Sequence, residues 1–309
     1  MQRELSWASL AFALAVGCGG GGDEGWERVS APPSSTTLTD VWAFSETDVW
    51  FVDGGPVVHR YDGSSWSTLE TPAAGVSCIF AISVEEVYLC AGGGLVRYDG
   101  ASFTVIDVET PTGLSAITDV WASSANDVWA VGDDAIAAHY DGTTWSRHSI
   151  GASFNSSVWG SGPDDVYVLG TFDLVHYDGS AWTEVSLDSG AGDGQVWGTR
   201  ASDVWVMTDS SSLAHYDGAS WQSVETDGFV GDLAAVWGPS PDDLWAAGSA
   251  GAIAHWDGRS WSEVTHQTIG SPYLRMLVAV HGTSSTDVWA VGYQLGEGGS
   301  SAVIYHHGP

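Results

Sequence analysis

Residues 127–145 read DVWAVGDDAIAAHYDGTTW, and this stretch decides the fold. Its first part, from Val128 to Val131, is rich in β-branched and aromatic residues and lacks the period of a helix, so it predicts a strand. The Asp141-Gly142 pair follows an apolar run and precedes Trp145, which is the pattern of a β-hairpin. The stretch therefore predicts short antiparallel strands joined by tight turns.

The same pattern recurs seven times along the chain. Each copy joins an acidic residue, an apolar residue and Trp or Tyr, and the acidic residues are Asp48, Glu86, Asp127, Asp165, Asp203, Asp243 and Asp287. A second large ring lies eight residues before each of these aromatics, at Trp42, Phe80, Trp121, Trp159, Trp197, Trp237 and His281. Four short strands in a unit of about 40 residues are typical of a propeller blade. We predict an all-β fold: a seven-bladed β-propeller of four-stranded antiparallel blades.

The two ends of the chain predict how the ring closes. The last unit stops at Pro309 without a fourth strand, whereas residues 25–30 (GWERVS) match residues 260–265 (SWSEVT), a fourth strand. We expect residues 26–30 to complete the last blade, which would also cover an exposed sheet edge. The alternative is an open solenoid with free ends, in which the terminal units would be atypical caps.

The repeat resembles the kelch repeat, and it is also similar to the Asp-box turn of sialidase-type propellers. The resemblance covers nearly all of residues 26–309 and implies a bacterial kelch-like propeller. Two features depart from these families. A glycine pair after the second strand occurs only in the first two units, and an Asp-box has an extra residue between its Asp and its Trp. The resemblance implies a fold, which does not by itself imply a function.

The N-terminal residues predict export. An apolar run from Leu5 to Val16 is too short to span a bilayer but suits a signal peptide. It ends in Ala-Val-Gly-Cys18, which resembles a bacterial lipobox, and four glycines follow. We therefore divide the chain into a lipoprotein signal peptide (1–17), a Gly-rich tether (18–25) and one propeller domain (26–309). We expect Cys18 to be lipidated and the protein to be anchored in the cell envelope, at the outer membrane or cell surface. An ordinary secretory signal with an incidental Cys is the alternative.

Charge excludes several classes of partner. The chain has 39 Asp and Glu against 8 Arg, no Lys, and a formal net charge of −31. Nucleic acid binding needs clustered cations, and so does docking on anionic lipid by charge alone. We therefore expect no nucleic acid partner, contact with the membrane only through the lipid, and a monomer. The charge is compatible with a saline habitat or with calcium binding; otherwise we expect no cofactor.

Residues that recur in every unit are expected to build blades rather than a site. The rings of the second and fourth strands, such as Trp129 and Trp145, should pack between neighbouring blades. The Asp of each Asp-Val-Trp triplet should accept backbone N–H bonds in a turn. A histidine precedes the later hairpin in four units, at His139, His176, His215 and His255, and we interpret these as structural residues rather than metal ligands.

Two of the three cysteines are predicted to be cross-strand neighbours. If Phe80 and Tyr88 face each other across a hairpin, the same register pairs Cys78 with Cys90. Directly opposed residues have Cβ atoms about 4.5–5.5 Å apart, and an exported compartment permits oxidation. We expect a Cys78–Cys90 disulfide, with two small buried side chains as the alternative.

A candidate ligand site lies where the loops are longest. The loops that join the second to the third strand share one face with the loops between blades, and the two longest insertions, 265–276 and 292–302, fall there. Loops on a rigid scaffold often carry function. The candidate binding residues are His266, Gln267, Tyr273, Arg275, Tyr293, Gln294 and Glu297. An insertion without a function is the alternative.

No catalytic motif stands out from the repeats. The chain has no Gly-x-Ser-x-Gly elbow, and its acidic pairs lie in repeated turns. We expect no catalytic residues and no metal site, and a surface-anchored scaffold that binds a protein partner or mediates adhesion. A lectin-like propeller that binds glycan is the alternative, and a glycan-processing hydrolase or lyase is a third class.

Overall fold

The computed structural model describes residues 25–308, except positions 34, 93, 115, 133, 153, 189, 193, 210, 227, 228, 230 and 266–273. The predicted signal peptide, Cys18 and most of the tether lie outside the described residues, as do His266, Gln267 and Tyr273. Among the described residues, no helix is long and apolar enough to cross a membrane.

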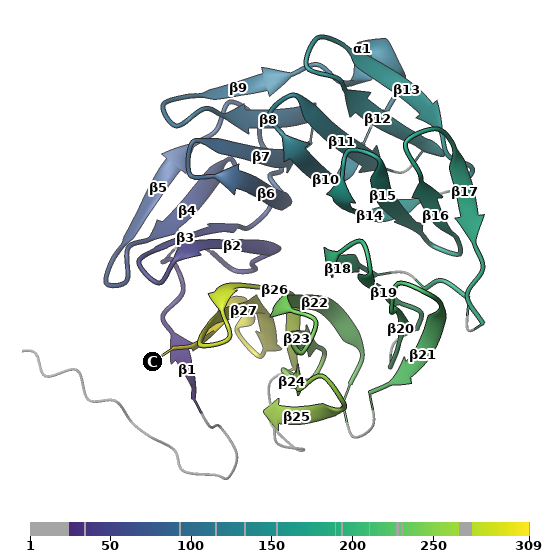
Figure 1. The fold of residues 1–309 in the computed structure, drawn as a ribbon. Coiled ribbons are helices and arrows are strands. Elements are labelled where there is room, and N and C mark those ends of the chain that lie inside the picture. Colours follow the sequence, from purple (N-terminus) through teal and green to yellow (C-terminus); the bar gives the residue numbers. More distant parts are fainter. Residues whose placement is uncertain are drawn as a thin grey trace, which may run out of the picture.

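The described chain forms seven four-stranded antiparallel sheets arranged in a ring (Figure 1). From the inner to the outer strand, blade 1 comprises β2 (Asp40–Ser45), β3 (Asp48–Val52), β4 (Val57–Tyr61) and β5 (Trp66–Glu70). Blade 2 comprises β6 (Cys78–Ser83), β7 (Glu86–Ala91), β8 (Gly94–Tyr98) and β9 (Phe103–Ile106). Blade 3 comprises β10 (Ile117–Ser124), β11 (Asp127–Gly132), β12 (Ile136–Tyr140) and β13 (Trp145–Ser149).

The remaining blades repeat this order. Blade 4 comprises β14 (Asn155–Gly162), β15 (Asp165–Gly170), β16 (Leu174–Tyr177) and β17 (Trp182–Val185). Blade 5 comprises β18 (Val196–Arg200), β19 (Asp203–Met207), β20 (Ser212–Tyr216) and β21 (Trp221–Glu225). Blade 6 comprises β22 (Leu233–Ser240), β23 (Asp243–Gly248), β24 (Ile253–Trp256) and β25 (Trp261–Thr265). A short helix, α1 (Glu109–Thr112), lies in the connection between blades 2 and 3. The predicted seven-bladed β-propeller is confirmed.

Blade 7 is completed by the opposite end of the chain. It comprises β26 (Leu274–Ser284), β27 (Asp287–Gly296), β28 (Gly299–His307) and β1 (Trp26–Val29), and Trp26 pairs with His307 (Figure 1). The Trp26 ring lies 5.3 Å from that of Trp245, as a fourth-strand ring of a neighbouring blade should. The predicted closure is therefore confirmed, and β1 ends one residue earlier than expected.

The core lies between blades rather than within them. Trp129 of blade 3 is fully buried, and its ring lies 5.4 Å from that of Trp182 in blade 4. Toward the centre, the Trp121 ring of blade 3 packs on Gly160 of blade 4, where an added Cβ would lie 2.7 Å from the ring. Large rings therefore join each blade to the next, and a small residue after the inner-strand ring gives them room.

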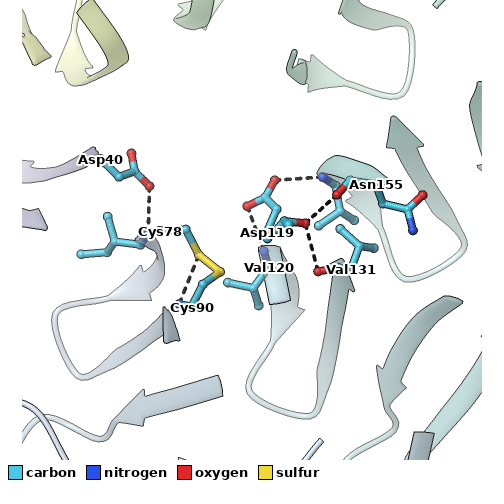
Figure 2. Close-up of a disulfide and its surroundings, with 10 residues drawn as sticks. Asp40, Cys78, Cys90, Asp119, Val120, Val131 and Asn155 are labelled. Atoms are coloured by element: carbon cyan, nitrogen blue, oxygen red, sulfur yellow. Dashed lines mark hydrogen bonds between the residues drawn. A yellow bond between two sulfur atoms is a disulfide. The ribbon is translucent and has the colours of Figure 1, made fainter. Parts of the chain in front are cut away.

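The register of blade 2 is also as predicted. Cys78 pairs with Cys90 and Phe80 with Tyr88, and the two sulfur atoms are bonded (Figure 2). The bond joins the two inner strands of one blade.

Truncation of an aromatic side chain that packs between two blades should destabilise the whole propeller. We expect Trp129→Ala to lower the free energy of unfolding by about 3–5 kcal/mol, because it leaves a large cavity between two blades. Chemical denaturation monitored by circular dichroism measures this loss. Phe172→Ala is the control, since Phe172 is 80% exposed; equal stability of the two variants would refute the packing role of Trp129.

Candidate functional site

Each blade carries one carboxylate on its second strand paired with a basic side chain on its third. In five blades the base is a histidine whose Nε2 lies 2.6–2.9 Å from the carboxylate: His139–Asp127, His176–Asp165, His215–Asp203, His255–Asp243 and His306–Asp287. In blades 1 and 2 an arginine replaces it, in the pairs Arg60–Asp48 and Arg97–Glu86. The expectation that these acids accept backbone bonds in a turn is wrong: the bonds described for them come from side chains.

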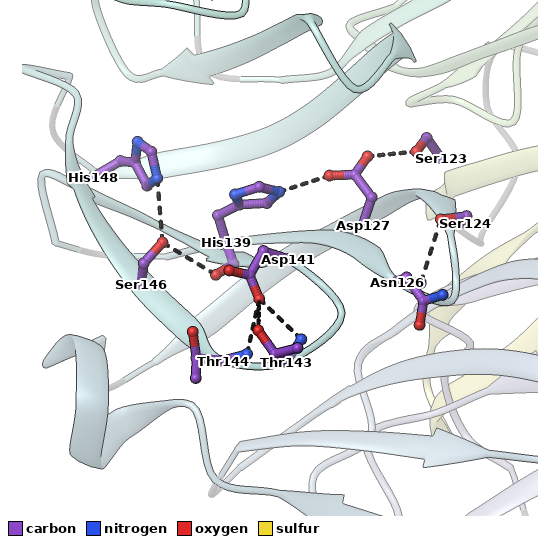
Figure 3. A network of polar contacts seen from close by, with 10 residues as sticks. All are labelled: Ser123, Ser124, Asn126, Asp127, His139, Asp141, Thr143, Thr144, Ser146 and His148. Atoms are coloured by element: carbon purple, nitrogen blue, oxygen red, sulfur yellow. Dashed lines mark hydrogen bonds and ion pairs between the residues drawn. The ribbon is translucent and has the colours of Figure 1, made fainter.

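In six of the seven blades, the number of carboxylate oxygens explains which residue accompanies the base; the exception is blade 6, where Pro239 stands beside the His255–Asp243 pair. Arg60 donates Nε to Asp48 Oδ1 at 2.7 Å and Nη2 to Oδ2 at 2.8 Å, so it satisfies both oxygens. A histidine satisfies one oxygen only. In blade 3 the other oxygen of Asp127 accepts a bond from Ser123 (Figure 3). A hydroxyl residue does the same in blades 4, 5 and 7, through Ser161, Thr199 and Thr283. The two blades with arginine have Phe44 and Ile82 at that position, where no donor is needed.

These histidines pack on the aromatic rings of their own blades. The His139 ring stacks on Trp129 with ring centroids 4.0 Å apart, and His176, His215 and His306 stack on their second-strand rings in the same way. Although partial burial alone would raise the pKa of Asp127, the bonds from His139 and Ser123 outweigh it and hold that pKa below its ordinary value. The carboxylate and ring contacts of His139, His176, His215 and His255 agree with the structural role predicted for them. No group of three or more potential metal ligands occurs among the described residues.

The central channel holds a second set of polar contacts, which join the inner strands of neighbouring blades. Asp40 of blade 1 accepts a bond from the Ile79 N–H of blade 2 at 2.8 Å, and Asp119 of blade 3 accepts one from the Val158 N–H of blade 4 at 2.9 Å (Figure 2). Ser157, Gln195 and His281 act as acceptors at other seams. The cavity that these residues line measures about 80 Å³, and the inner-strand rings form much of its wall.

Burial changes the charge of these channel groups. Desolvation raises the pKa of Asp40 to about 7, although its two backbone bonds oppose the rise, and the charge of Asp119 adds to it. Desolvation likewise raises the pKa of Asp119 to about 6. Burial lowers the pKa of His281 to about 3, which keeps the ring neutral and able to accept a bond from the Ala43 N–H. The channel therefore contains two carboxyl groups that titrate near neutrality.

Ser35, Asp53 and His59 meet at the seam between blades 7 and 1. Ser35 Oγ lies 3.0 Å from His59 Nε2 and 2.8 Å from Asp53 Oδ2. In a nucleophilic triad the acid orients the histidine through the ring nitrogen that the serine does not contact. Here Asp53 contacts the same nitrogen as Ser35, at 2.9 Å. The ring cannot serve as the serine's base in this arrangement, so the cluster holds the seam together rather than forming a nucleophile.

The predicted ligand residues that the structure describes lie where β26, β27 and β28 extend beyond the strands of the other blades, which we call the raised hairpin of blade 7. Arg275 of β26 pairs with Gln294 of β27, whereas Tyr293 pairs with Met276 and Ala302. Because side chains alternate across a strand, Arg275 and Gln294 share one face of the sheet and Tyr293 lies on the other. Glu297 lies in the turn between β27 and β28. These four residues are therefore divided between the two faces and the turn of this part of blade 7.

The predicted insertion at 292–302 is not a loop, which corrects the sequence interpretation. β27 and β28 pair without interruption from Val288–His307 to Gly296–Gly299. The extra residues extend the blade-7 hairpin beyond the length of the others, and β1 pairs with β28 only from Ile304 to His307.

Sequence reasoning missed a set of exposed apolar residues on the loop face. Phe154 is 64% exposed and Phe172 80% exposed, and both lie in connections of blade 4 on this face. Leu274 and Leu295 are also exposed and face each other on the raised hairpin. Only solvent exposure distinguishes these four residues from the many apolar residues that face the core.

Comparison with known proteins agrees with the fold. No protein-family model matches the chain, and no curated protein sequence matches it. Among solved structures, YCF48 from Cyanidioschyzon merolae is 15% identical with a TM-score of 0.68, and the match covers 92% of this chain and 99% of that one. Virginiamycin B lyase from Staphylococcus aureus, with quinupristin, is 11% identical with a TM-score of 0.73, covering 91% and 98%. A structure of YCF48 bound to D1 peptide is 14% identical, with a TM-score of 0.67, covering 92% and 97%. At these identities the likeness shows the propeller fold alone.

The channel carboxylates should give stability a characteristic pH dependence. A folded-state pKa above the unfolded value means that charging Asp40 costs stability, so this cost grows as pH rises from about 4 to about 7. We expect Asp40→Asn to gain stability relative to the parent protein across that window, by at most about 1.4 kcal/mol per pH unit. His281 acts in the opposite direction below about pH 6.5 in both proteins, so the difference between them isolates Asp40. Urea unfolding between pH 4 and 8 measures it, with the exposed Glu85→Gln as control; parallel curves for parent and Asp40→Asn would contradict it.

Proposed function

We propose that this protein is an exported, lipid-anchored scaffold that binds a protein partner through its loop face, without catalysis. The observation that carries the proposal is the exposure of Phe154, Phe172, Leu274 and Leu295 on that one face. Exposed apolar side chains that lie together often mark interaction sites, and these four fall in two pairs, one in the connections of blade 4 and one on paired strands of blade 7. The blades beneath them are joined by buried rings, so the face is presented on a rigid support.

The polar clusters support a non-catalytic role. The basic residue on the third strand of each blade is paired with an acid, and the Ser35–Asp53–His59 contacts do not form a relay. One structural neighbour, YCF48, is seen bound to D1 peptide, which supports a peptide-binding use of this fold. The net charge of −31 favours a partner with a basic surface.

Partner binding should depend on the loop face and not on the opposite face. We expect the full-length protein to recover a partner from a cell-envelope extract, and the double variant Phe172→Ser, Leu295→Ser to lose at least about 90% of it, because it removes apolar contact area. Ile82→Ser with Val84→Ser is the matched control, since both residues are exposed apolar positions on the other face. Quantitative mass spectrometry of the recovered proteins gives the readout, and equal recovery by both double variants would contradict the assignment.

Anchoring should depend on Cys18. The apolar run and the Cys18 that follows it predict lipidation. Several acyl chains on one cysteine hold a protein on a membrane far better than a single acyl chain does. We expect the parent protein in the membrane fraction and Cys18→Ala in the soluble fraction or retained as an uncleaved precursor. Immunoblots of fractionated cells provide the measurement; a processed Cys18→Ala protein that stays in the membrane fraction would argue against a lipid anchor.

A further inference from the structure

Six of the seven seams between blades are closed by the same ring contact. The ring of the second strand touches a third- or fourth-strand ring of the next blade, with centroids 5.2–6.2 Å apart. The contacts are Trp50–Tyr98, Trp129–Trp182, Tyr167–Trp221, Trp205–Trp256, Trp245–Trp26 and Trp289–Tyr61. Contact alone does not fill every one of these seams, because a cavity of about 520 Å³ borders Trp289 and Tyr61 between blades 7 and 1.

The seam between blades 2 and 3 is different. Its second-strand ring, Tyr88, has no such contact with Tyr140 or Trp145 of blade 3, and a cavity of about 320 Å³ lies between them. Five other blades have the larger Trp where blade 2 has Tyr88. Blade 2 also has Arg97 where five blades have a histidine next to the ring, stacked on it in four of them. Blade 2 thus departs from the common repeat at two positions that border this cavity.

The walls of this cavity combine an aromatic surface with a polar rim. Tyr140 and Trp145 lie together on the blade-3 side, with ring centroids 5.5 Å apart, and both are half-buried. Arg97 borders the blade-2 side, with its Nε and Nη2 held by Glu86 at 2.6 and 2.5 Å. The hydroxyl of Thr104 and the amide of Asn126 complete the rim. A guanidinium has five N–H donors, and an amide offers both a donor and an acceptor.

We propose that this cavity binds one neutral sugar ring. A pyranose has an apolar C–H face that packs on aromatic rings and an edge of hydroxyl groups that both donate and accept hydrogen bonds. The pocket volume lies at the small end of ligand pockets, about 300–1,000 Å³, so it fits a single ring rather than a chain of them. Glu86 neutralises Arg97 and the chain carries −31, so an anionic sugar is disfavoured.

This site is independent of the proposed protein-binding function. Ala125 and Asn126 lie in the turn between the first two strands of blade 3, so the cavity opens toward the hairpin-turn face, opposite the loop face. Failure of one assignment therefore leaves the other standing.

The test uses a substitution that the repeat itself supplies. Tyr88→Trp installs the residue found at this position in five blades and should fill the cavity, whereas Tyr167→Trp makes the same change in blade 4, whose seam is already filled. The probes are methyl α-glucoside, methyl β-galactoside, methyl α-mannoside and N-acetylglucosamine, with glucuronic acid as the anionic comparison and N-acetylphenylalanine amide as a peptide side-chain mimic. Saturation-transfer NMR and titration of the full-length protein measure binding, and thermal melts confirm that the variants fold.

We expect at least one neutral sugar to bind with a Kd of about 1 mM or tighter, and Tyr88→Trp to weaken it about tenfold or more while Tyr167→Trp leaves it within about twofold. Asn126→Ala changes an exposed turn residue and keeps Tyr88. It should weaken sugar binding several-fold, and it tests the proposal if Tyr88→Trp fails to fold. Absence of binding by all four neutral sugars would overturn the proposal. Equal affinity in Tyr88→Trp and Tyr167→Trp would overturn it too, as would binding of the phenylalanine amide alone.

Discussion

The packing of one large ring against the next blade is the contact on which the rest of the structure depends. A four-stranded sheet of this size cannot bury Trp129 or its counterparts by itself, so each blade needs a neighbour on both sides. In an open array the two end blades would each lack one neighbour. Closure by β1 removes both ends, because Trp26 supplies to blade 6 the ring contact that the incomplete last repeat cannot.

The same geometry explains the charged residues of a strongly acidic chain. A carboxylate next to a buried ring has two oxygens to satisfy, and the repeats meet this need in two ways. Arginine satisfies both oxygens at once, whereas histidine satisfies one and a serine or threonine hydroxyl satisfies the other. In six blades the residue at the hydroxyl position therefore changes together with the base, as Ile82 with Arg97 and Ser123 with His139 show, whereas blade 6 has Pro239 with His255.

Because so many polar groups maintain the ring, the surfaces left for function are those where the repeat is broken. Blade 7 is extended beyond the others and exposes Leu274 and Leu295, and blade 4 exposes Phe154 and Phe172. Blade 2 departs in another way, with Tyr88 and Arg97 in place of the more common Trp and His, and a cavity lies at its seam. The proposed protein surface and the proposed sugar pocket thus lie on opposite faces, each at a departure from the common pattern.

The sequence by itself determined the blade count, the closure and the pairing of Cys78 with Cys90. These follow from spacing along the chain, because a repeat with fixed hairpins has a fixed register. The role of the acid in each Asp-Val-Trp triplet needed the tertiary structure. The sequence shows a base directly before the third-strand ring in each blade, but the acid lies on the second strand. Only the pairing of these two strands shows that the acid and the base meet. The extended hairpin at residues 292–302 also needed the tertiary structure, because length alone does not distinguish a loop from an extended hairpin. The cavity beside Tyr88 was also beyond the sequence, since it depends on how side-chain volumes from two blades add up across a seam.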